Sequence, residues 1–255
     1  MYKKLTKQDF LNAFKLPDDY TIDSFVVYGT YKDELPGFLS VLENTLGIKV
    51  EISNFQSNFL RPVTSLKVND KIIWFANAYG GTLLSEWLHI ACLFGCKQTI
   101  QIGSCGGLLD DVSSGDIIIP DSSYGNESST RLYSEDRNTN FTYYPNKTLV
   151  QRAKMLLESQ HKVWIAPTTT CQAMLAESQE DIDNWRKDAY AAVEMEASTV
   201  FAVSNFFKVP AVSILFVGDN LVKEESVLSD SYQAASDKRK EAQRDIFACV
   251  AELVK

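Results

Sequence analysis

Two carboxylates in the second half of the chain stand where a small ligand would meet them. Glu196 lies in the segment 192–198 and would open a helix. There its carboxylate can accept two hydrogen bonds from a vicinal diol such as ribose, roughly 1.5–3 kcal/mol for each charge-assisted bond. Asp219 follows the apolar run 211–217 and would sit just past the end of a buried strand. Ligands in open α/β sheets collect outside the carboxyl ends of strands, so Asp219 is aimed at a pocket.

The elements that must position these carboxylates alternate along the chain between strand and helix patterns. This alternation predicts an α/β sheet covered on both faces. The polar segments 121–144 and 220–231 read as excursions over the surface. The first could be a lid or an oligomer contact, and the second could close over a bound ligand. The predicted strands span 23–28, 72–78, 98–102, 116–119, 163–166 and 211–217, and the predicted helices span 82–94, 146–159, 194–207 and 231–254.

The composition is typical of a soluble globular protein, most simply one domain of the larger α/β type. Of 255 residues, 45% are hydrophobic and 23% are charged. The net charge of −8 argues against a general binder of nucleic acid or of anionic membranes. No apolar stretch approaches the roughly 18 residues that span a bilayer, and the first residues lack the apolar core of a signal peptide. We therefore expect a cytoplasmic protein with a small-molecule partner, and neither a nucleic-acid nor a membrane partner.

The cysteines predict free thiols and no metal site. They are five in number and scattered, with no paired C-x-x-C elements. Cys92 and Cys96 lie four residues apart on a predicted helix, with His89 beside them. Because the chain has only two histidines, we interpret these cysteines as buried small apolar residues and not as zinc ligands.

A glycine-rich turn, residues 103–107, directly follows the predicted strand 98–102. Missing side chains there let backbone N–H groups and the Ser104 hydroxyl approach an anion or a sugar, which makes Ser104 and Gly106 candidate ligand contacts. The segment is not a P-loop, because the terminal Gly-Lys-Ser/Thr is absent, and its spacing is not the dinucleotide fingerprint. A tight turn without a ligand is the alternative.

Four motifs in order, 103–107, 114–120, 193–197 and 218–219, resemble those of the nucleoside phosphorylase superfamily. This superfamily contains purine nucleoside phosphorylases, uridine phosphorylases and methylthioadenosine/S-adenosylhomocysteine nucleosidases. The resemblance covers residues 25–255 and leaves 1–24 as an N-terminal extension. It implies a single three-layer αβα domain with a central mixed, mostly parallel sheet, cleavage of a nucleoside N-glycosidic bond, and a homo-oligomer such as a dimer or hexamer. No metal or organic cofactor is implied, although phosphate is a possible co-substrate.

The resemblance also assigns substrate contacts. Glu196 would bind the ribose 2′ and 3′ hydroxyls, and Met195 would pack on the sugar. Met174 stands where an aromatic residue often stacks on the base, and Tyr79 would lie near the 5′ side of the sugar. Glu194 receives no role, because two residues apart on a helix are about 200° apart around its axis, so we expect Glu194 to be peripheral or solvated.

Asp219 matches the family aspartate that acts as a general acid. A purine leaves poorly as an anion, and protonating N7 as the bond to C1′ breaks commonly contributes roughly 10²–10⁴-fold. A desolvated pocket would raise the pKa of Asp219 and keep it protonated. The uridine branch reads its base with a glutamine and arginine pair where this chain has 171–174, and the arginine is missing, which favours a purine-type base. Gly218 replaces the serine that often precedes the aspartate and helps to hold it.

The arginines that phosphorolytic members bring to phosphate are missing where they are expected. Gln101 occupies the arginine position two residues before the glycine turn, and Asp33 stands four residues after Gly29 in the first phosphate loop. A phosphate of roughly −1.5 to −2 charge would be repelled by Asp33, and a neutral amide does not replace a guanidinium. Lys32, or Arg61 lent by a neighbouring subunit, would compensate only in part.

The hydrolytic nucleosidases offer a better match at the same loop. Their general base is a glutamate five residues after the glycine, and Glu34 stands five residues after Gly29. Gln101 approximates the uncharged amide residue that these enzymes carry before the glycine turn. A solvated carboxylate at a helix start is the alternative for Glu34. We expect hydrolysis ahead of phosphorolysis, and a nucleoside-binding or storage protein without turnover is the remaining alternative.

Overall fold

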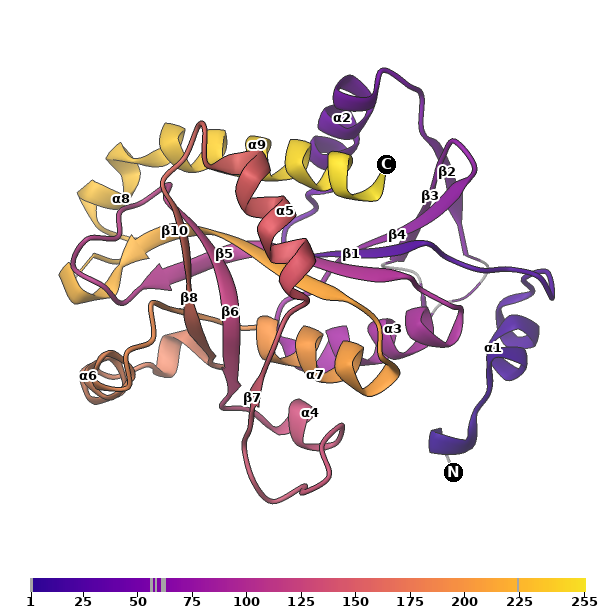
Figure 1. Cartoon of the computed structure of the whole chain (residues 1–255), viewed down its shortest axis with the longest axis horizontal. Coiled ribbons are helices and arrows are strands. Elements are labelled where there is room, and N and C mark those ends of the chain that lie inside the picture. The colour runs from indigo at the N-terminus through magenta and orange to yellow at the C-terminus, as the bar shows by residue number, and fades with distance from the viewer. Residues whose placement is uncertain (1, 56, 58, 61–62, 224) are drawn as a thin grey trace.

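One mixed sheet organises the chain (Figure 1). The computed structural model describes residues 2–55, 57, 59, 60, 63–223 and 225–255. Within them, ten strands pair in the order β10-β6-β8-β9-β5-β1-β4-β3-β2, with β7 beside β6. The strands are β1 (Ser24–Gly29), β2 (Glu51–Asn54), β3 (Val63–Val68), β4 (Lys71–Asn77), β5 (Gln98–Gly107), β6 (Ile117–Gly125), β7 (Thr142–Tyr143), β8 (Val163–Thr170), β9 (Ala192–Glu194) and β10 (Ala211–Asn220).

The long pairings at the centre of the sheet are parallel, as is the short pairing of β8 with β9, and the other pairings are antiparallel. β1 lies parallel to β4 and β5, β5 to β10, and β6 to β8. β10 also pairs with β6, antiparallel, so β5, β9, β8, β6 and β10 close into a ring. The predicted central mixed sheet is confirmed.

Apolar side chains project from both faces of the sheet into two hydrophobic cores. In β1, Val26 and Tyr28 join the core on one face, whereas Phe25 and Val27 join the core on the other. Successive side chains of a strand point to opposite faces, so a strand that is buried twice reads as a continuous apolar run. This is the physical basis of the run seen in the sequence.

Helices cover both faces, which confirms the predicted three layers. α2, α5 and α9 pack on one face (upper in Figure 1), and α3 and α7 pack on the other, where α1 adds Leu11 and Phe14. The helices of eight or more residues are α1 (Lys7–Phe14), α2 (Leu35–Leu46), α3 (Gly81–Leu93), α5 (Lys147–Leu157), α6 (Gln179–Lys187), α7 (Ala197–Phe207) and α9 (Ser236–Val254), and the shorter ones are α4 (Ser128–Arg131) and α8 (Asp230–Ala234).

Several predicted boundaries are corrected. β5 continues through the glycine-rich segment to Gly107, and β10 continues to Asn220, because the two strands stay paired as far as Gly107 and Asn220. The helix predicted over 231–254 breaks between α8 and α9, and the helix predicted over 194–207 begins at Ala197. The segment 121–144 is less irregular than predicted, because it contains the end of β6, α4 and β7.

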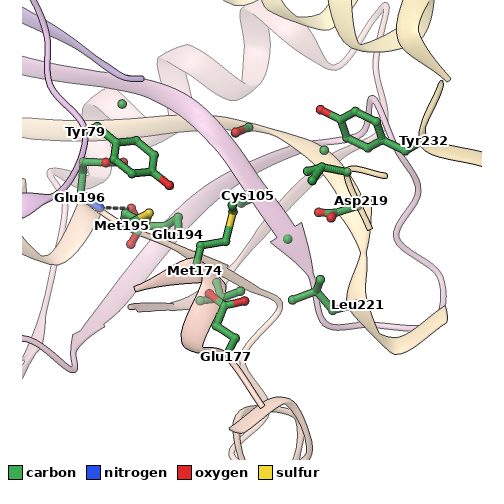
Figure 2. A pocket seen from close by; sticks show the side chains of 16 residues that line it. Tyr79, Cys105, Met174, Glu177, Glu194, Met195, Glu196, Asp219, Leu221 and Tyr232 are labelled. Atoms are coloured by element: carbon green, nitrogen blue, oxygen red, sulfur yellow. Dashed lines mark hydrogen bonds between the residues drawn. The ribbon is translucent and has the colours of Figure 1, made fainter. Parts of the chain in front are cut away.

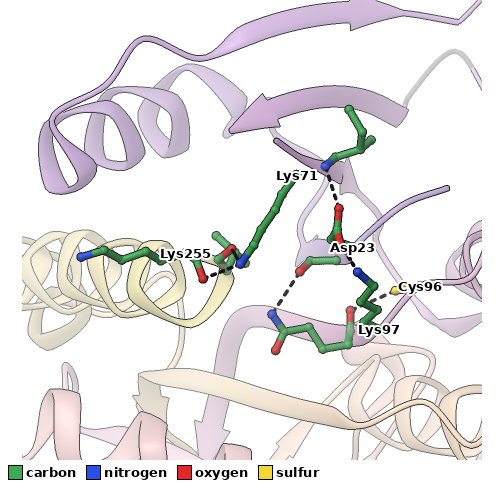
Figure 3. Close-up of polar contacts among 9 residues, drawn as sticks. Asp23, Lys71, Cys96, Lys97 and Lys255 are labelled. Atoms are coloured by element: carbon green, nitrogen blue, oxygen red, sulfur yellow. Dashed lines mark hydrogen bonds and ion pairs between the residues drawn. The ribbon is translucent and has the colours of Figure 1, made fainter. Parts of the chain in front are cut away.

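The last turns of α9 are tied to the start of the central strands (Figure 3). Gln98 Nε2 donates to Ser24 Oγ and to the carbonyl of Leu253, both at 3.0 Å, and Lys71 Nζ donates to the carbonyl of Lys255 at 2.6 Å. Within the described residues, no helix is long and apolar enough to cross a membrane. The domain boundary at residue 24 stays a prediction.

Candidate active site

One pocket opens where the carboxyl ends of β1, β5 and β10 meet the corner between β9 and α7 (Figure 2). These three strands are parallel, so they end at the same edge of the sheet. The pocket is lined by eight residues that were predicted as ligand contacts or site residues, namely Gly29, Tyr79, Ser104, Gly106, Met174, Met195, Glu196 and Asp219.

Glu196 lies at one end of the pocket, beside Tyr79 (Figure 2). It is the residue before α7, is 3% exposed, and accepts a 2.7 Å hydrogen bond from the backbone N–H of Gly80. A side chain at Gly29 would overlap its carboxylate, so the glycine makes room for the acid. Burial, and secondly the neighbouring Glu194, raise the pKa of Glu196 to about 8. A diol that donates two hydrogen bonds would favour the ionised form.

Glu194 was predicted to be peripheral or solvated, and this is wrong. It ends β9, is 4% exposed, and lines the pocket. Its Oε2 accepts from the backbone N–H groups of Glu196 at 2.7 Å and Ala197 at 2.6 Å, and Thr170 donates to its Oε1. Helical spacing does not apply, because the chain turns between β9 and α7. Glu194 therefore holds the corner that presents Glu196, and burial raises its pKa to about 7.

Asp219 lies at the other end of the pocket, near Tyr232 and Leu221 (Figure 2). It was expected just past a strand, but it lies within β10, after a bulge between Val217 and Asp219 that places it opposite Gly106. A bulge re-aims the side chains that follow it. Burial is the largest cause that raises the pKa of Asp219, to about 6.

Glu177 is a pocket residue that the sequence analysis missed. It directly follows the 3₁₀ turn Met174–Ala176, lines the pocket and accepts a hydrogen bond from the thiol of Cys171. Burial, and secondly the charge of Asp219, raise its pKa to about 7. The sequence pattern that could have predicted Glu177 is its spacing of three residues from Met174, because side chains at i and i+3 of a 3₁₀ turn lie on one side.

Gly29 and Ser104, two of the residues predicted for the phosphate or water site, line the pocket, whereas Gln101, Glu34 and Lys32 are not among its described walls. Gln101 is fully buried in the sheet, where Ser213 donates to its Oε1, and its Nε2 has no hydrogen-bond partner among the described residues. Glu34 precedes α2, and its Oε2 accepts a 2.9 Å hydrogen bond from Gln243. Lys32 is exposed on the loop between β1 and α2. Arg61 lies outside the described residues, so the roles of these four residues stay predictions.

The pocket is acidic. Four of its described wall residues are carboxylic acids, Glu177, Glu194, Glu196 and Asp219, and the described walls contain neither lysine nor arginine. Like charges in a desolvated cavity favour protonated carboxyls and neutral ligands over anions. The site is therefore suited to a polyhydroxyl ligand and to proton donation.

Comparison with known proteins identifies the family. The model of the Phosphorylase superfamily matches residues 84–255, and the chain belongs to this superfamily. Among curated proteins it is similar to a guanosine phosphorylase of Halorubrum lacusprofundi, 28% identical over 58% of this chain and 60% of that protein. It is also similar to a DeoD-type purine nucleoside phosphorylase of Exiguobacterium sp., 27% identical over 56% of this chain and 60% of that protein. The matched region thus spans about three fifths of the length of these relatives.

Solved structures share the fold over nearly the whole chain. A uridine phosphorylase of Vibrio fischeri superposes with a TM-score of 0.75 at 17% identity, covering 94% of this chain and 95% of that one. A 5′-methylthioadenosine/S-adenosyl homocysteine nucleosidase of Campylobacter jejuni superposes with a TM-score of 0.70 at 13% identity, covering 91% and 99%. These likenesses establish the three-layer fold.

Proposed function

We propose that this protein cleaves the N-glycosidic bond of a purine-type nucleoside and releases the free base. The observation that carries the proposal is a pair of carboxyls at the two ends of one pocket, the buried Glu196 and the half-buried Asp219 (Figure 2). One end is suited to a sugar diol and the other to a base that needs a proton. Membership of the Phosphorylase superfamily supports the same reaction.

Each wall residue has a role in this proposal. Glu196 accepts hydrogen bonds from the 2′ and 3′ hydroxyls, and Met195 packs on the sugar. Met174 packs on the base, and Asp219 donates its proton to N7 as the C1′–N bond breaks, so the base leaves neutral. Ser104 and Gly106 lie on the wall formed by β5, where Ser104 is exposed to the pocket and offers a hydroxyl.

The base is proposed to be a purine. Gln172 is the glutamine of the segment where the uridine branch reads its base, and here its Nε2 donates to the Met195 carbonyl at 3.0 Å while its Oε1 accepts from Gly81 at 3.3 Å. Both of its functional groups are therefore engaged with backbone. The curated relatives named for guanosine and purine nucleosides support the same choice.

Water is the proposed nucleophile, since the described walls offer no lysine or arginine to bind a phosphate dianion. In hydrolysis the water oxygen bonds to C1′ as the C1′–N bond breaks, and the leaving purine takes the proton of Asp219. The water gives up a proton to a general base, for which Glu34 is the candidate. Phosphorolysis giving ribose 1-phosphate is the second candidate, favoured by the similarity to a guanosine phosphorylase and a purine nucleoside phosphorylase. It would need positive charge from Lys32 or from a neighbouring subunit.

The test is to incubate the purified protein with a panel of purine nucleosides, including 5′-methylthioadenosine, with and without phosphate, and to identify the sugar product. Free sugar formed without phosphate supports hydrolysis, and sugar 1-phosphate formed only with phosphate supports the second candidate. Asp219→Asn is the matched variant and should lose turnover while it keeps nucleoside binding. Binding without turnover in the unmodified protein would identify a nucleoside-binding or storage protein.

Glu34 needs a separate test, because it lies outside the pocket walls. Glu34→Gln should abolish hydrolysis if this carboxylate takes the water proton. Glu43→Gln in α2, the helix that Glu34 precedes, is the control, since Glu43 accepts a hydrogen bond from the Val50 backbone at 2.9 Å. Equal rates for Glu34→Gln and the unmodified protein would show that another group activates water.

We also propose that the protein works as a homo-oligomer, a dimer or a hexamer, as its superfamily resemblance suggests. Large apolar side chains that are exposed on α3 and α7 and after α4 support this proposal, namely Leu83, Phe206 and Leu132. Light scattering of the purified protein measures the number of subunits.

A further inference from the structure

A buried carboxylate lies behind the sugar end of the pocket and is not one of the wall residues. Glu127 is 6% exposed and directly precedes α4, which packs against α3 and α7 (Figure 1). Its Oε1 accepts from the backbone N–H of Thr130 at 2.8 Å, and its Oε2 accepts from the backbone N–H of Ser129. A buried carboxylate is costly unless it is hydrogen-bonded, so these two donors hold Glu127 in one place.

Glu127 also binds the helix that follows Glu196. The hydroxyl of Thr199, in the first turn of α7, donates to Glu127 Oε1 at 3.0 Å. Thr199 is fully buried. Because threonine is branched at Cβ, a rotation of its side chain exchanges the places of the hydroxyl and the methyl group. The bond to Glu127 therefore decides where the Thr199 hydroxyl points.

The turn that enters α3 packs directly on this hydroxyl. Gly81 begins α3, and a Cβ there would overlap the Thr199 hydroxyl and lie 3.1 Å from the Thr199 Cβ. A methyl group in place of the hydroxyl would need more room and would push the turn away. Beside this contact, the hydroxyls of Thr82 and Ser129 form a hydrogen bond at 3.4 Å. α4 and α7 together therefore set the position of the turn 80–82.

The same turn holds the acid that binds the sugar in the proposed reaction. The backbone N–H of Gly80 donates to Glu196 Oε1 at 2.7 Å. The next N–H, that of Gly81, donates to Gln172 Oε1 at 3.3 Å. A shift of the turn moves the Gly80 donor, and the carboxylate that this donor orients moves with it.

We propose that Glu127 is a positioning residue for the sugar-binding carboxylate. It fixes the Thr199 hydroxyl, this hydroxyl sets the place of the turn 80–82, and the Gly80 N–H of that turn orients Glu196. The segment 127–131, within the surface excursion 121–144, thereby supports the site from behind. This inference rests on the proposed function for the role of Glu196.

The test compares Thr199→Val with Thr199→Ser. Valine places a methyl group where the hydroxyl meets Gly81 and cannot donate to Glu127, whereas serine keeps the hydroxyl. Ser204→Ala is the matched control. Ser204 is buried in the same helix and donates to Thr99 Oγ1 at 3.2 Å, so this variant also loses a buried hydrogen bond, but away from the turn 80–82.

The readout is the preference for a vicinal diol, measured as the ratio of kcat/KM for a purine ribonucleoside to kcat/KM for its 2′-deoxy analogue. Thr199→Val should lower this ratio about tenfold, the effect of one weakened hydrogen bond to a charged group, mainly by raising the KM of the ribonucleoside. Thr199→Ser and Ser204→Ala should keep the ratio, because a loss of stability alone lowers both rates together. An unchanged ratio in Thr199→Val would overturn the inference.

Two further variants act at the two ends of these contacts. Glu127→Ala removes the acceptor of the Thr199 hydroxyl and should lower the ratio in the same way. Gly81→Ala keeps the test usable if Glu127→Ala does not fold, because alanine is favoured over glycine in a helix and its methyl group meets Thr199 from the other side. A ratio equal to that of the unmodified protein in these variants would contradict the role of Glu127.

A measurement without substrate separates a failure of this inference from a failure of the proposed function. Hydrogen exchange of the Gly80 amide, followed by NMR, reads how firmly its N–H is held by Glu196. Thr199→Val and Glu127→Ala should speed this exchange, and Ser204→Ala should not. Unchanged exchange contradicts the inference on its own. Faster exchange in a protein that turns over no nucleoside supports these contacts and refutes only the proposed function.

Discussion

At the scale of single residues, neighbouring carboxylates have different tasks because their partners differ. Glu194 accepts from two backbone N–H groups and from Thr170, which uses most of its acceptor positions inside the protein. Glu196 accepts from Gly80 and lines the pocket, so acceptor positions are left for a ligand. One acid supports the corner, and the other is available to bind.

Replacement of the two glutamates should separate these tasks. Glu196→Ala removes the acceptor for a diol, and at roughly 1.5–3 kcal/mol for a bond to a charged group KM should rise at least tenfold. Its melting temperature should fall less than that of Glu194→Ala, because Glu196 accepts from one backbone N–H and Glu194 from two. Glu194→Ala leaves the Glu196 and Ala197 N–H groups without their acceptor, so it should lower the melting temperature by several degrees. Steady-state kinetics and thermal melts measure both effects, and equal KM values in Glu196→Ala and the unmodified protein would remove the diol role.

The acid at the other end of the pocket predicts a pH dependence. Asp219 must carry a proton to donate it, and its pKa is raised from 3.8 to about 6, chiefly by burial. Protonated Asp219 is therefore lost as the pH rises through about 6, so kcat/KM should fall above that pH. A kcat/KM profile from pH 4.5 to 8 measures this limb, and the residual rate of Asp219→Asn should lack it. A rate that rises through this range would contradict the role of Asp219 as an acid.

At the scale of elements, the pocket depends on how closely strand ends approach the β9–α7 corner. Gly29 ends β1 at a point where a side chain would overlap the Glu196 carboxylate. The acid can occupy this position because β1 ends in a residue without a Cβ. Strand end and helix start therefore form one unit.

Gly29→Ala should damage this unit without breaking the fold. The added methyl displaces the Glu196 carboxylate, and a shift of about 1 Å in a binding group can lower kcat/KM roughly 100-fold. Gly37→Ala in α2 is the matched control, since a Cβ there would meet the Phe247 ring at an ordinary 3.6 Å. Alanine in a helix is favoured over glycine by roughly 0.5–1 kcal/mol, so the control should be active and slightly more stable. An active Gly29→Ala protein would show that Glu196 has room to move.

At the scale of the whole molecule, the acids of the ligand-free pocket lower the free energy of unfolding when they ionise. Four acids face one cavity, in a protein of net charge −8. The pKa of Glu196 is raised from 4.5 to about 8, and those of Glu194 and Glu177 to about 7. Their ionisation therefore works against the folded state, which the rest of the sheet and its two helical layers must offset.

This predicts that the ligand-free protein becomes less stable as the pH rises. Between the unfolded pKa of 4.5 and the folded pKa of about 8, the folded protein binds more protons than the unfolded chain at Glu196, so the free energy of unfolding falls. The slope for one such group is on the order of 1 kcal/mol per pH unit. Urea titrations at pH 5.5 and pH 8 measure it, and Glu196→Gln should flatten the difference. Equal stabilities at the two pH values would show that these carboxyls ionise freely.

Much of the fold was predictable because its signals are local. A strand buried on both faces must be apolar at successive positions, so 98–102 and 211–217 were found, and an amphipathic helix must repeat its apolar residues, so α3 and α5 were found close to their true ends. Asp219 and Glu196 were found because of where they stand relative to these elements. Short strands such as β9 leave too few residues for any pattern, and their existence depends on partners far along the chain.

The amino-acid sequence by itself determined the alternation of strand and helix, the covered sheet and the two acids at element ends, because hydrophobic periodicity and position at a strand or helix end are properties of neighbouring residues. Only the tertiary structure decided that Glu194 is buried, that Glu177 shares the pocket, and that Gln101 and Glu34 lie outside its walls. These outcomes depend on which distant segments meet, and on the burial and charge that each side chain experiences there. A side chain's position in the sequence does not contain that information.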